Sequence, residues 1–450
     1  MKTQVRDMTK GAYAPMMLAF ALPLMLGNIF QQLYTVSDAA IVGRFVGVTA
    51  LASIGAADWM NWGFLGIIMG FTQGFSILVS QYFGANDKKG LSKTIGNSLT
   101  LCVILAVIMS IVGQIMVKPL LILLNTPSGV LEGAVLYVRI FFIGIPIVTA
   151  YNFFSGVLRA LGNSKTPLIA MVIASVINIS LDLGFILIFN WGIAGAAIAT
   201  VTAQLFSAIF CYIKIRKIDI IEFNKEHYKL DKNFSEKLLK LGFPIASMNV
   251  IIAVGGIAIQ SIVNKYGVSF IAGYTATNKL YGLLEIAALS LSYSASTFAG
   301  QNLGAKKFNR IRKGTLTCLY LALASSVVIT AVMILFGKNI LSLFVASSQE
   351  NAAEVIKIGY EYLVVMASSL ASLYTLYTIR STLQGLGNTL IPMLSGIAEL
   401  VMRLAAVIFL PRFVDYWGIF IAEPLAWIAA ALLLVTSYIK TVRSYPKEDI

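Results

Sequence analysis

The chain is a succession of long apolar runs, separated by short polar segments and by clusters of glycine and proline. Many of the runs contain about 20 residues or more, the length that an α-helix needs to cross the hydrocarbon core of a membrane. The breaks between runs predict twelve membrane-spanning helices, several of them long enough to require a tilt or a kink. The predicted spans are 15–43, 50–82, 94–117, 134–159, 166–189, 192–215, 240–264, 271–299, 314–336, 357–384, 390–411 and 417–440.

Composition supports this pattern. Of the 450 residues, 58% are hydrophobic and 12% are charged, whereas soluble proteins have roughly 45–50% and 25%. A soluble domain of this size could not bury so much apolar surface. The first 17 residues lack the short apolar core and the small-residue cleavage site of a secretory signal. We therefore expect an all-α, multi-pass protein embedded in the lipid of the cell membrane, plasma or inner.

The net charge of +14 is unevenly distributed along the chain. If the N-terminus is cytoplasmic, the inner segments hold 24 of the 34 Lys and Arg residues and the outer segments hold 6. This asymmetry satisfies the positive-inside rule and predicts that both termini are cytoplasmic. Because topology accounts for the positive charge, we expect no binding of nucleic acid.

Few residues in the sequence suggest catalysis. The three cysteines fall within apolar spans and the single histidine, His227, lies in a polar segment, so neither a disulfide framework nor a zinc site is indicated. The chain also lacks a Gly-x-Ser-x-Gly elbow, a phosphate-binding loop and a soluble catalytic domain. We expect neither an enzyme nor a bound cofactor.

The two halves of the chain resemble each other at an offset of 220 to 226 residues, and the matching motifs occur in the same order, which indicates a duplication. Six helices per repeat give parallel repeats, as in transporters that work by alternating access. We predict an N-lobe at 1–215, a cytoplasmic connector at 216–238 and a C-lobe at 239–450. The matches are Pro23 and Asn28 with Pro244 and Asn249, SQYFGA with GQNLGA, LGNSKTP with LGNTLIP, and WGI at 191–193 with WGI at 417–419.

Ionisable residues inside a membrane span are functional candidates by default. Asp38, Asp182 and Thr200 all lie roughly 8–12 Å below the outer boundary, at ~1.5 Å per residue. Tyr34 is one turn from Asp38, and Asn178 is one turn from Asp182. Together these side chains would make an oxygen-rich cage, suited either to Na⁺ or to a carboxylate that carries a proton.

Structural roles for these acids are the alternative. Asp38 could reach the outer water or pair with Arg44, although Arg44 lies on nearly the opposite side of the helix. Asp182 could make a hydrogen bond to a neighbouring helix. The repeat supplies a control, because the second half is built without these acids. The residues that match Asp38, Asn178, Asp182 and Thr200 are Ile259, Arg403, Val407 and Ala426.

Other charges fall within the predicted spans of the second half. Glu399 and Arg403 are four residues apart and are predicted to form a structural pair. Arg380 lies near a span end, and we expect it to extend toward water. Lys279 and Glu285 are candidates for the wall of a substrate cavity, where Glu285 would attract cations; a hydrogen bond within the lobe is the alternative.

Several motifs resemble those of the multidrug and toxic compound extrusion (MATE) transporters. They are the pattern P-x4-N…Y-x3-D-x4-GR in the first span, the SQYFGA/GQNLGA pair, RALGNSKTP and NISLDLGFI. The resemblance covers nearly the whole chain. It implies a V-shaped pair of six-helix bundles, and secondary efflux of organic cations and other amphipathic compounds in exchange for Na⁺ or H⁺.

The resemblance also implies roles for single residues. It places Gln31 and Tyr34 in a polar cluster with the four predicted coupling residues, and Pro23 at a bend of the first helix. Another branch of the family carries a glutamate in the seventh helix and an aspartate in the tenth, which this chain lacks. Cation coupling is therefore expected in the N-lobe. The coupling residues implied are Asp38, Asn178, Asp182 and Thr200.

We expect a monomeric multidrug antiporter that works by alternating access. The alternative is a flippase for lipids or lipid-linked oligosaccharides, whose families have a related two-lobe architecture. A flippase would need a more cationic cavity for phosphate headgroups. Only four Lys or Arg residues lie within the predicted spans away from their first and last two residues, and this favours the antiporter.

Overall fold

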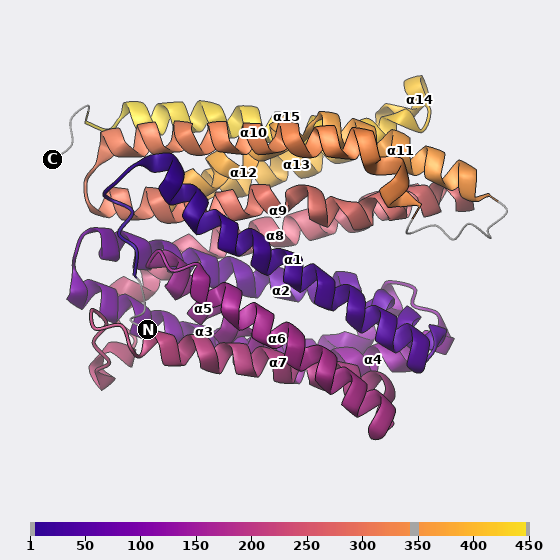
Figure 1. Cartoon of the computed structure of the whole chain (residues 1–450), viewed down its shortest axis with the longest axis horizontal. Coiled ribbons are helices and arrows are strands. Elements are labelled where there is room, and N and C mark those ends of the chain that lie inside the picture. Colours follow the sequence, from indigo (N-terminus) through magenta and orange to yellow (C-terminus); the bar gives the residue numbers. More distant parts are fainter. Residues whose placement is uncertain (1–4, 343–350, 447–450) are drawn as a thin grey trace. The chain divides into compact units, whose positions relative to one another are not determined.

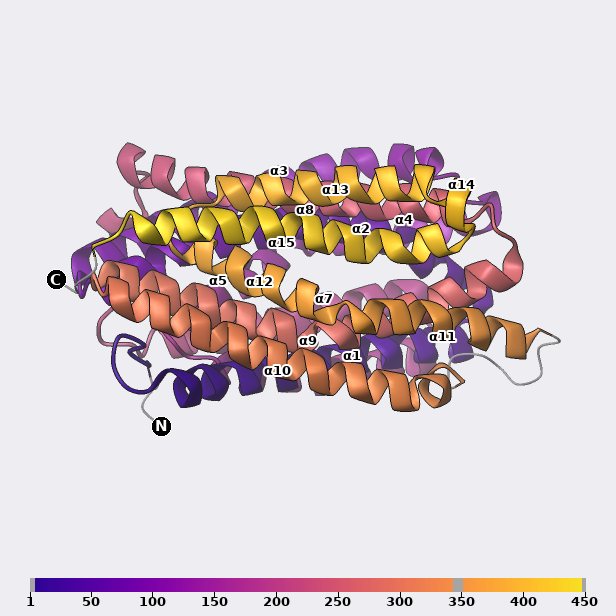
Figure 2. The same cartoon turned by 90° about the horizontal axis from the view of Figure 1, so that it is seen from above.

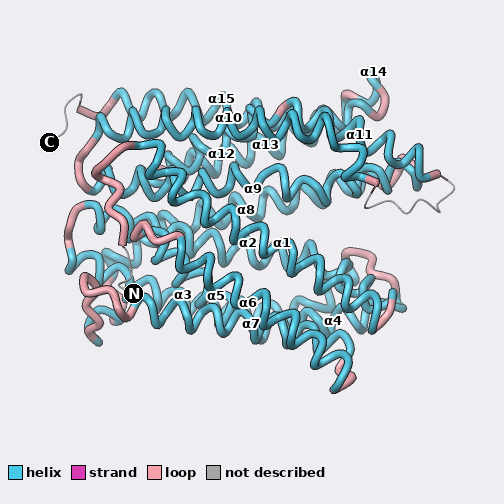
Figure 3. The backbone as a smooth tube through the Cα atoms, in the orientation of Figure 1, coloured by secondary structure: helices cyan, strands magenta, loops and turns pink. Residues whose placement is uncertain are grey.

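The computed structural model describes residues 5–342 and 351–446 of the chain. Within these ranges all regular secondary structure is helical (Figure 3). The ends of the predicted cytoplasmic tails, 1–4 and 447–450, lie outside the described residues. The helices, as labelled in Figure 1, are α1 (Tyr13–Phe45), α2 (Val48–Gly84), α3 (Lys88–Leu123), α4 (Ser128–Ile143), α5 (Ile145–Ala160), α6 (Lys165–Leu183), the π-helical η1 (Gly184–Ile188), α7 (Gly192–Ile215), the 3₁₀-helical η2 (Lys225–Tyr228), α8 (Lys232–Val263), α9 (Val268–Gly304), α10 (Phe308–Leu341), α11 (Ala352–Ser368), α12 (Leu370–Gly385), α13 (Leu390–Phe409), α14 (Pro411–Val414) and α15 (Trp417–Arg443).

These helices supply the twelve segments that the hydrophobic pattern predicts. Among the described residues, nine helices are long and apolar enough to cross a membrane, or eleven if each of two bent pairs counts as one span. The pair α4 and α5 is bent by 51° and the pair α11 and α12 by 49°. The twelfth segment is α9, which is 37 residues long and whose apolar sequence is interrupted by polar and charged residues. The predicted all-α class is confirmed.

The repeat is also visible in the turns of the backbone. A left-handed conformation is accessible to glycine and, with some strain, to Asn, Asp and a few other residues. Residues with a positive φ angle occur at equivalent turns of the two halves, which is expected if both halves descend from one six-helix plan. The matched pairs are Gly47 and Gly267, Asn86 and Lys306, Gly162 and Gly387, and Asn190 and Asp415.

The contacts divide the chain into two compact units, and the divisions fall inside helices. The first unit contains Leu22–Asn249 and the described part of Met1–Lys10; the second contains Gly11–Ala21 and the described part of Val250–Ile450. The beginning of α1 therefore groups with the second unit and the beginning of α8 with the first. The lobe boundaries expected from the sequence, at 215 and 239, stay predictions.

The first unit packs around a core of aromatic and aliphatic side chains from α2, α3, α4 and α5. The rings of Phe64 and Phe142 lie 4.5 Å apart within it. Gly113 on α3 allows this packing, because a Cβ atom there would come within 2.3 Å of the Phe142 ring. Next to this core α6 and α7 lie side by side (Figure 1), and this pair carries the candidate site.

The connector after α7 is fastened to the start of α3. Asn97 donates to the carbonyl of His227 at 3.1 Å and accepts the N–H of Asp231 at 2.7 Å. Asp231 in turn caps α8, because its carboxylate accepts the N–H of Phe234 at 3.2 Å. An ion pair with Lys93 at 2.7 Å lowers the pKa of Asp231. This cap begins α8 at Lys232, eight residues before the apolar span expected at 240.

The second unit has a similar inventory of helices. Its last two long helices, α13 and α15, run alongside each other (Figure 2). Four stacked aromatic rings fill the space between α9, α11 and α15. In stacking order they are Phe270, Phe420, Tyr362 and Tyr274, and the centroids of successive rings lie 4.8 to 5.5 Å apart.

Candidate functional site

Two carboxylates lie together inside the first unit. Asp38 on α1 is 8% exposed, and Asp182 near the end of α6 is fully buried. Their carboxyl groups are close enough to share a hydrogen bond if one of them is protonated. Neither forms an ion pair with any described Lys or Arg. In particular, Asp38 is not paired with Arg44, whose guanidinium lies over the ring of Phe45.

Neutral polar side chains from α6 and α7 stand beside these acids. Asn178 is one turn before Asp182, and its amide donates to the hydroxyl of Thr200 at 3.4 Å. Small residues leave a cavity of about 10 Å³ between the helices, the lower limit for one water-sized occupant, which is about 10–15 Å³. The cavity is lined by Tyr34, Ala174, Asn178, Thr200, Ala203 and Gln204.

The buried oxygen atoms of this cluster have too few donors. Leaving a buried polar atom without a partner costs about 1–3 kcal/mol. Five such atoms would together cost about as much as the whole net stability of a typical domain, ~5–15 kcal/mol. All five are hydrogen-bond acceptors, so a positively charged occupant or a proton would satisfy them. They are Oδ1 of Asp38, Oδ1 of Asn178, both carboxylate oxygens of Asp182 and Oε1 of Gln204.

The backbone changes its winding next to this cluster. Helix α6 ends at Leu183 and continues as the π-helical turn η1 from Gly184. Single π-turns are rare and frequently occur at functional sites. The sequence predicted one continuous span here, because its apolar pattern continues through the π-turn.

The remaining residues predicted for the polar cluster lie on α1. Tyr34 is half-buried, and its hydroxyl is within hydrogen-bonding reach of the Gln204 amide. Gln31 is exposed, with its side chain outside the cavity lining. Pro23 is half-buried and lies within α1, which continues through it as a helix. The structure thus brings Tyr34 to the cavity, whereas Gln31 is not one of the residues that line it.

Three polar residues of this region were missed by sequence reasoning. Gln204 follows Thr200 by one helical turn, and this spacing could have revealed it. Asp58 on α2 is an acid within the predicted span 50–82, and its charge was a signal in the sequence. Tyr137 on α4 is buried and lies within electrostatic range of Asp38, Asp58 and Asp182; an isolated tyrosine in an apolar run gives no signal of this kind.

The two candidates on α9 are not joined to each other. The hydroxyl of Tyr377 on α12 donates to the Glu285 carboxylate at 3.0 Å, and Tyr281 is a second hydrogen-bonding neighbour. Lys279 is exposed. Glu285 therefore has a hydrogen bond within its own unit, which was one of the two alternatives.

Buried charges in the second unit form a balanced network. Glu399 is paired with Arg380 and lies 4.0 Å from Arg403, which bonds to Glu423 at 2.8 Å. The predicted structural pair of Glu399 and Arg403 is present. The expectation that Arg380 extends toward water was wrong: it is 4% exposed and also donates to Ser395. Its partner Glu399 lies on another helix, so the amino-acid sequence alone does not reveal this ion pair.

The internal repeat relates this network to the cavity of the first unit. Ala174 and Asn178, which line the cavity, match Glu399 and Arg403 at the same helical positions of α13. The second unit thus carries the buried side chain of Arg403 where the first unit has Asn178 at the edge of a cavity.

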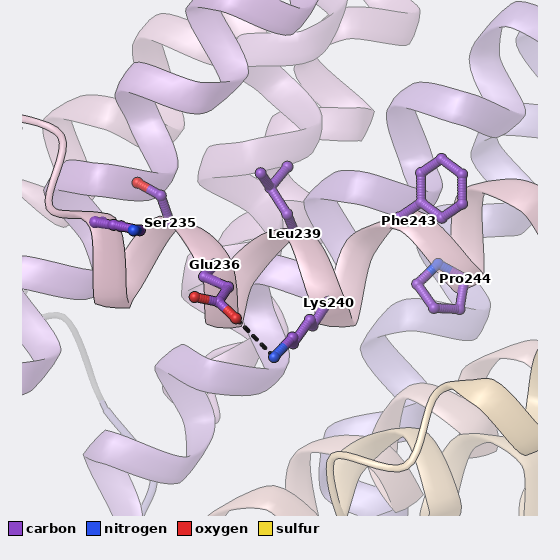
Figure 4. Close-up of a pocket in the computed structure, with 7 residues that line it drawn as sticks. Ser235, Glu236, Leu239, Lys240, Phe243 and Pro244 are labelled. Atoms are coloured by element: carbon purple, nitrogen blue, oxygen red, sulfur yellow. Dashed lines mark ion pairs between the residues drawn. The ribbon is translucent and has the colours of Figure 1, made fainter.

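A shallow depression runs along the beginning of α8 (Figure 4). Leu239 and Phe243 form its apolar wall, and Glu236 and Lys240 make an ion pair of 2.7 Å beside them. The charges in this depression compensate each other, in contrast to those of Asp38 and Asp182. We therefore assign the candidate site to the cluster of α1, α6 and α7.

The fold and this cluster define a multi-pass helical membrane protein made of two related halves. The profile of the MatE family matches residues 23–183 and 244–408. The chain belongs to this family of multidrug efflux transporters, as the motifs in the sequence suggested.

Individual relatives agree with this assignment. The chain is 29% identical over 438 residues to the probable multidrug resistance protein YoeA of Bacillus subtilis, covering 95% of this chain and 93% of the relative. It is 31% identical over 357 residues to the probable multidrug resistance protein YpnP of the same organism, covering 79% of each. Among solved structures, a MOP superfamily transporter from Pyrococcus furiosus matches with a TM-score of 0.91 and 20% identity over 98% of each chain, and so shares the fold.

Proposed function

We propose that this protein exports organic cations and other amphipathic compounds from the cell in exchange for Na⁺ or H⁺. It would work as a monomer in the plasma or inner membrane, with both termini in the cytoplasm. The observation that carries the proposal is the buried pair of Asp38 and Asp182, which no described Lys or Arg neutralises. The names of YoeA and YpnP support a role in drug resistance.

The coupling step follows from the electrostatics of the pair. A cation or proton that enters from outside is held by Asp38 and Asp182, with Asn178 and Thr200 as neutral ligands, and removes the repulsion between the two carboxylates. Relief of this repulsion changes the packing of α1, which can bend near Pro23 because proline removes a backbone donor.

Exchange also requires that the ion and the drug favour different conformations. A drug cation needs an attractive surface in the state that lacks the coupling ion. On α9, the Glu285 carboxylate with Tyr281 and Tyr377 offers a negative charge beside aromatic rings, which attract organic cations. Lys279, which is exposed, is proposed to lie in the wall of the same substrate cavity.

Transport by purified protein in liposomes tests the proposal. A fluorescent organic cation is followed while a Na⁺ gradient and a pH gradient are imposed separately. Asp38→Asn and Asp182→Asn should each lower coupled transport at least about tenfold. Each substitution removes one charged ligand of the coupling ion, and an interaction with a charged group contributes about 1.5–3 kcal/mol to binding. Asp219→Asn makes the same chemical change at an exposed connector residue and should transport normally.

Normal export by both variants of the buried acids, under either gradient, would show that coupling does not use this pair. A wild-type protein that moves no cationic dye but flips a lipid-linked sugar would instead establish the flippase function.

A further inference from the structure

Gln204 is the one member of the cavity with a buried, unpartnered oxygen to which the family resemblance assigns no role. It lies on α7 one turn after Thr200, and both side chains line the cavity. Its Oε1 is buried and without a hydrogen-bond donor, as is Oδ1 of Asn178, another residue of the cavity lining. The cavity is thus lined by two amide side chains whose buried oxygens have no hydrogen-bond partner, and Tyr34, a third lining residue, is within electrostatic range of Asp38 and Asp182.

The orientation of the amide is consistent with a ligand role. Tyr34 is within hydrogen-bonding reach of Gln204. An amide has a donor end and an acceptor end, so holding the nitrogen leaves the oxygen available. The Tyr34 contact would then hold the nitrogen end of the side chain and leave the buried oxygen free to accept from an occupant.

The second half of the chain shows that the fold does not need an amide at this position. Thr200 and Gln204 match Ala426 and Ala430 of α15, and both alanines are fully buried. At the equivalent place in the second unit Arg403 supplies the positive charge within the protein. An extra acceptor on this helix therefore accompanies the open cavity and is missing where a fixed cation is present.

Proton binding and metal-ion binding use such an acceptor differently. A proton is held by one or two acceptors, and the carboxylates of Asp38 and Asp182 suffice for it. A hard metal cation is surrounded by several oxygen atoms, and neutral carbonyl oxygens complete its shell without adding charge. The three neutral groups here, Asn178, Thr200 and Gln204, are superfluous for a proton and useful for Na⁺.

We propose that Gln204 is a further ligand of the coupling ion, and that its amide oxygen makes Na⁺ the preferred ion at this site. The inference rests on the proposed coupling function of Asp38 and Asp182. It adds a residue that sets the choice of ion, where the proposed function leaves Na⁺ and H⁺ open.

Binding of radioactive ²²Na⁺ to the full-length protein, together with transport under separate gradients, tests the inference. Gln204→Leu keeps a similar volume and removes the oxygen. We expect it to weaken Na⁺ binding at least about tenfold, the effect of losing one ligand to a charged species, and to lower transport driven by a pH gradient without Na⁺ by a clearly smaller factor.

Two further variants separate ligand loss from misfolding. Gln204→Glu retains an oxygen at the same distance along the side chain and should preserve Na⁺ binding. Thr202→Val removes a hydroxyl from the same helix, but that hydroxyl already donates to the carbonyl of Ile198, so Na⁺ binding should not change. A loss of pH-driven transport in Gln204→Leu equal to its loss of Na⁺ binding would contradict a role in ion choice.

The inference and the function can fail independently. Unchanged Na⁺ binding in Gln204→Leu, or a wild type that binds no Na⁺ and transports only with a pH gradient, would overturn the role of Gln204 and leave the exporter intact. Normal coupling in both Asp38→Asn and Asp182→Asn would overturn the exporter mechanism itself.

Discussion

At the scale of single residues, the two units treat buried charge in opposite ways. Arg403 stands between Glu399 and Glu423 in the second unit, whereas Asp38 and Asp182 have no described cationic partner in the first. Burying a charge without compensation is expensive, so a permanent network suits a structural role and an uncompensated pair suits exchange. The same six-helix plan thus contains a paired charge network in one copy and an unpaired couple of acids in the other, which is the arrangement that our proposed exchange mechanism requires.

Removing Arg403 should test the structural role of the network. Arg403→Met leaves the carboxylate of Glu423 buried without its partner, and we expect a loss of about 3–5 kcal/mol of stability. Thermal unfolding in detergent would measure it. The double variant Arg403→Met/Glu423→Met should recover most of the loss, because Glu399 keeps Arg380. A double variant as unstable as the single one would contradict this assignment.

The sequence predicted site residues where a single position carries the signal. Asp38 and Asp182 were found because acids are rare inside membrane spans, and Thr200 because it shares their depth. Gln204 was missed because an uncharged amide is less conspicuous, and its unpartnered oxygen becomes apparent only when α6 packs on α7. Arg380 was assigned wrongly because its partner is on another helix.

At the scale of elements, the connector between α7 and α8 packs against the beginning of α3. The backbone of His227 packs directly on Gly96, where a Cβ atom would come within 2.2 Å of the His227 carbonyl oxygen. Hydrogen bonds from Asn97 and Thr100 hold the same stretch at 3.1 and 2.8 Å. This packing keeps the beginning of α8 fixed to α3.

A larger residue at Gly96 should release the connector. Gly96→Val pushes η2 away from α3 and breaks the Asn97 hydrogen bonds, so local opening becomes more frequent. We expect trypsin to cut after Lys225 or Lys229 several-fold faster than in the wild type. Gly129→Val, at a helical glycine with no atom within 4 Å of its Cβ position, is the control. Equal cleavage of the Gly96 variant and the wild type would show that the docking is weak.

The pattern of apolar runs predicted where helices exist better than how they bend. The span expected at 134–159 is two helices bent by 51° at Gly144, and the span at 357–384 is bent by 49° at Ser369. Neither break interrupts the apolar character on which the prediction depends. The early start of α8 was missed for the converse reason, because its first turns are polar and rely on the Asp231 cap.

At the scale of the whole molecule, the duplication and the charge asymmetry lead to one topology. With six spans in each half, both halves are expected to enter the membrane from the same side, and the positive-inside rule predicts that this side is cytoplasmic. The loop between α3 and α4 is then outside, and the connector between the halves is inside. In the proposed cycle, the direction of drug movement and the side from which the coupling ion reaches Asp38 both depend on this orientation.

Cysteine labelling in intact cells tests this topology. The native thiols of Cys102, Cys211 and Cys318 are buried and should not react with a membrane-impermeant maleimide, so the wild type serves as the background. Ser128→Cys, in the exposed first turn of α4, should be labelled from outside. Lys10→Cys, Lys225→Cys and Ser444→Cys should be labelled only after permeabilisation. The reverse pattern would place the termini outside, and outward movement of drugs through the proposed cycle would then become uptake.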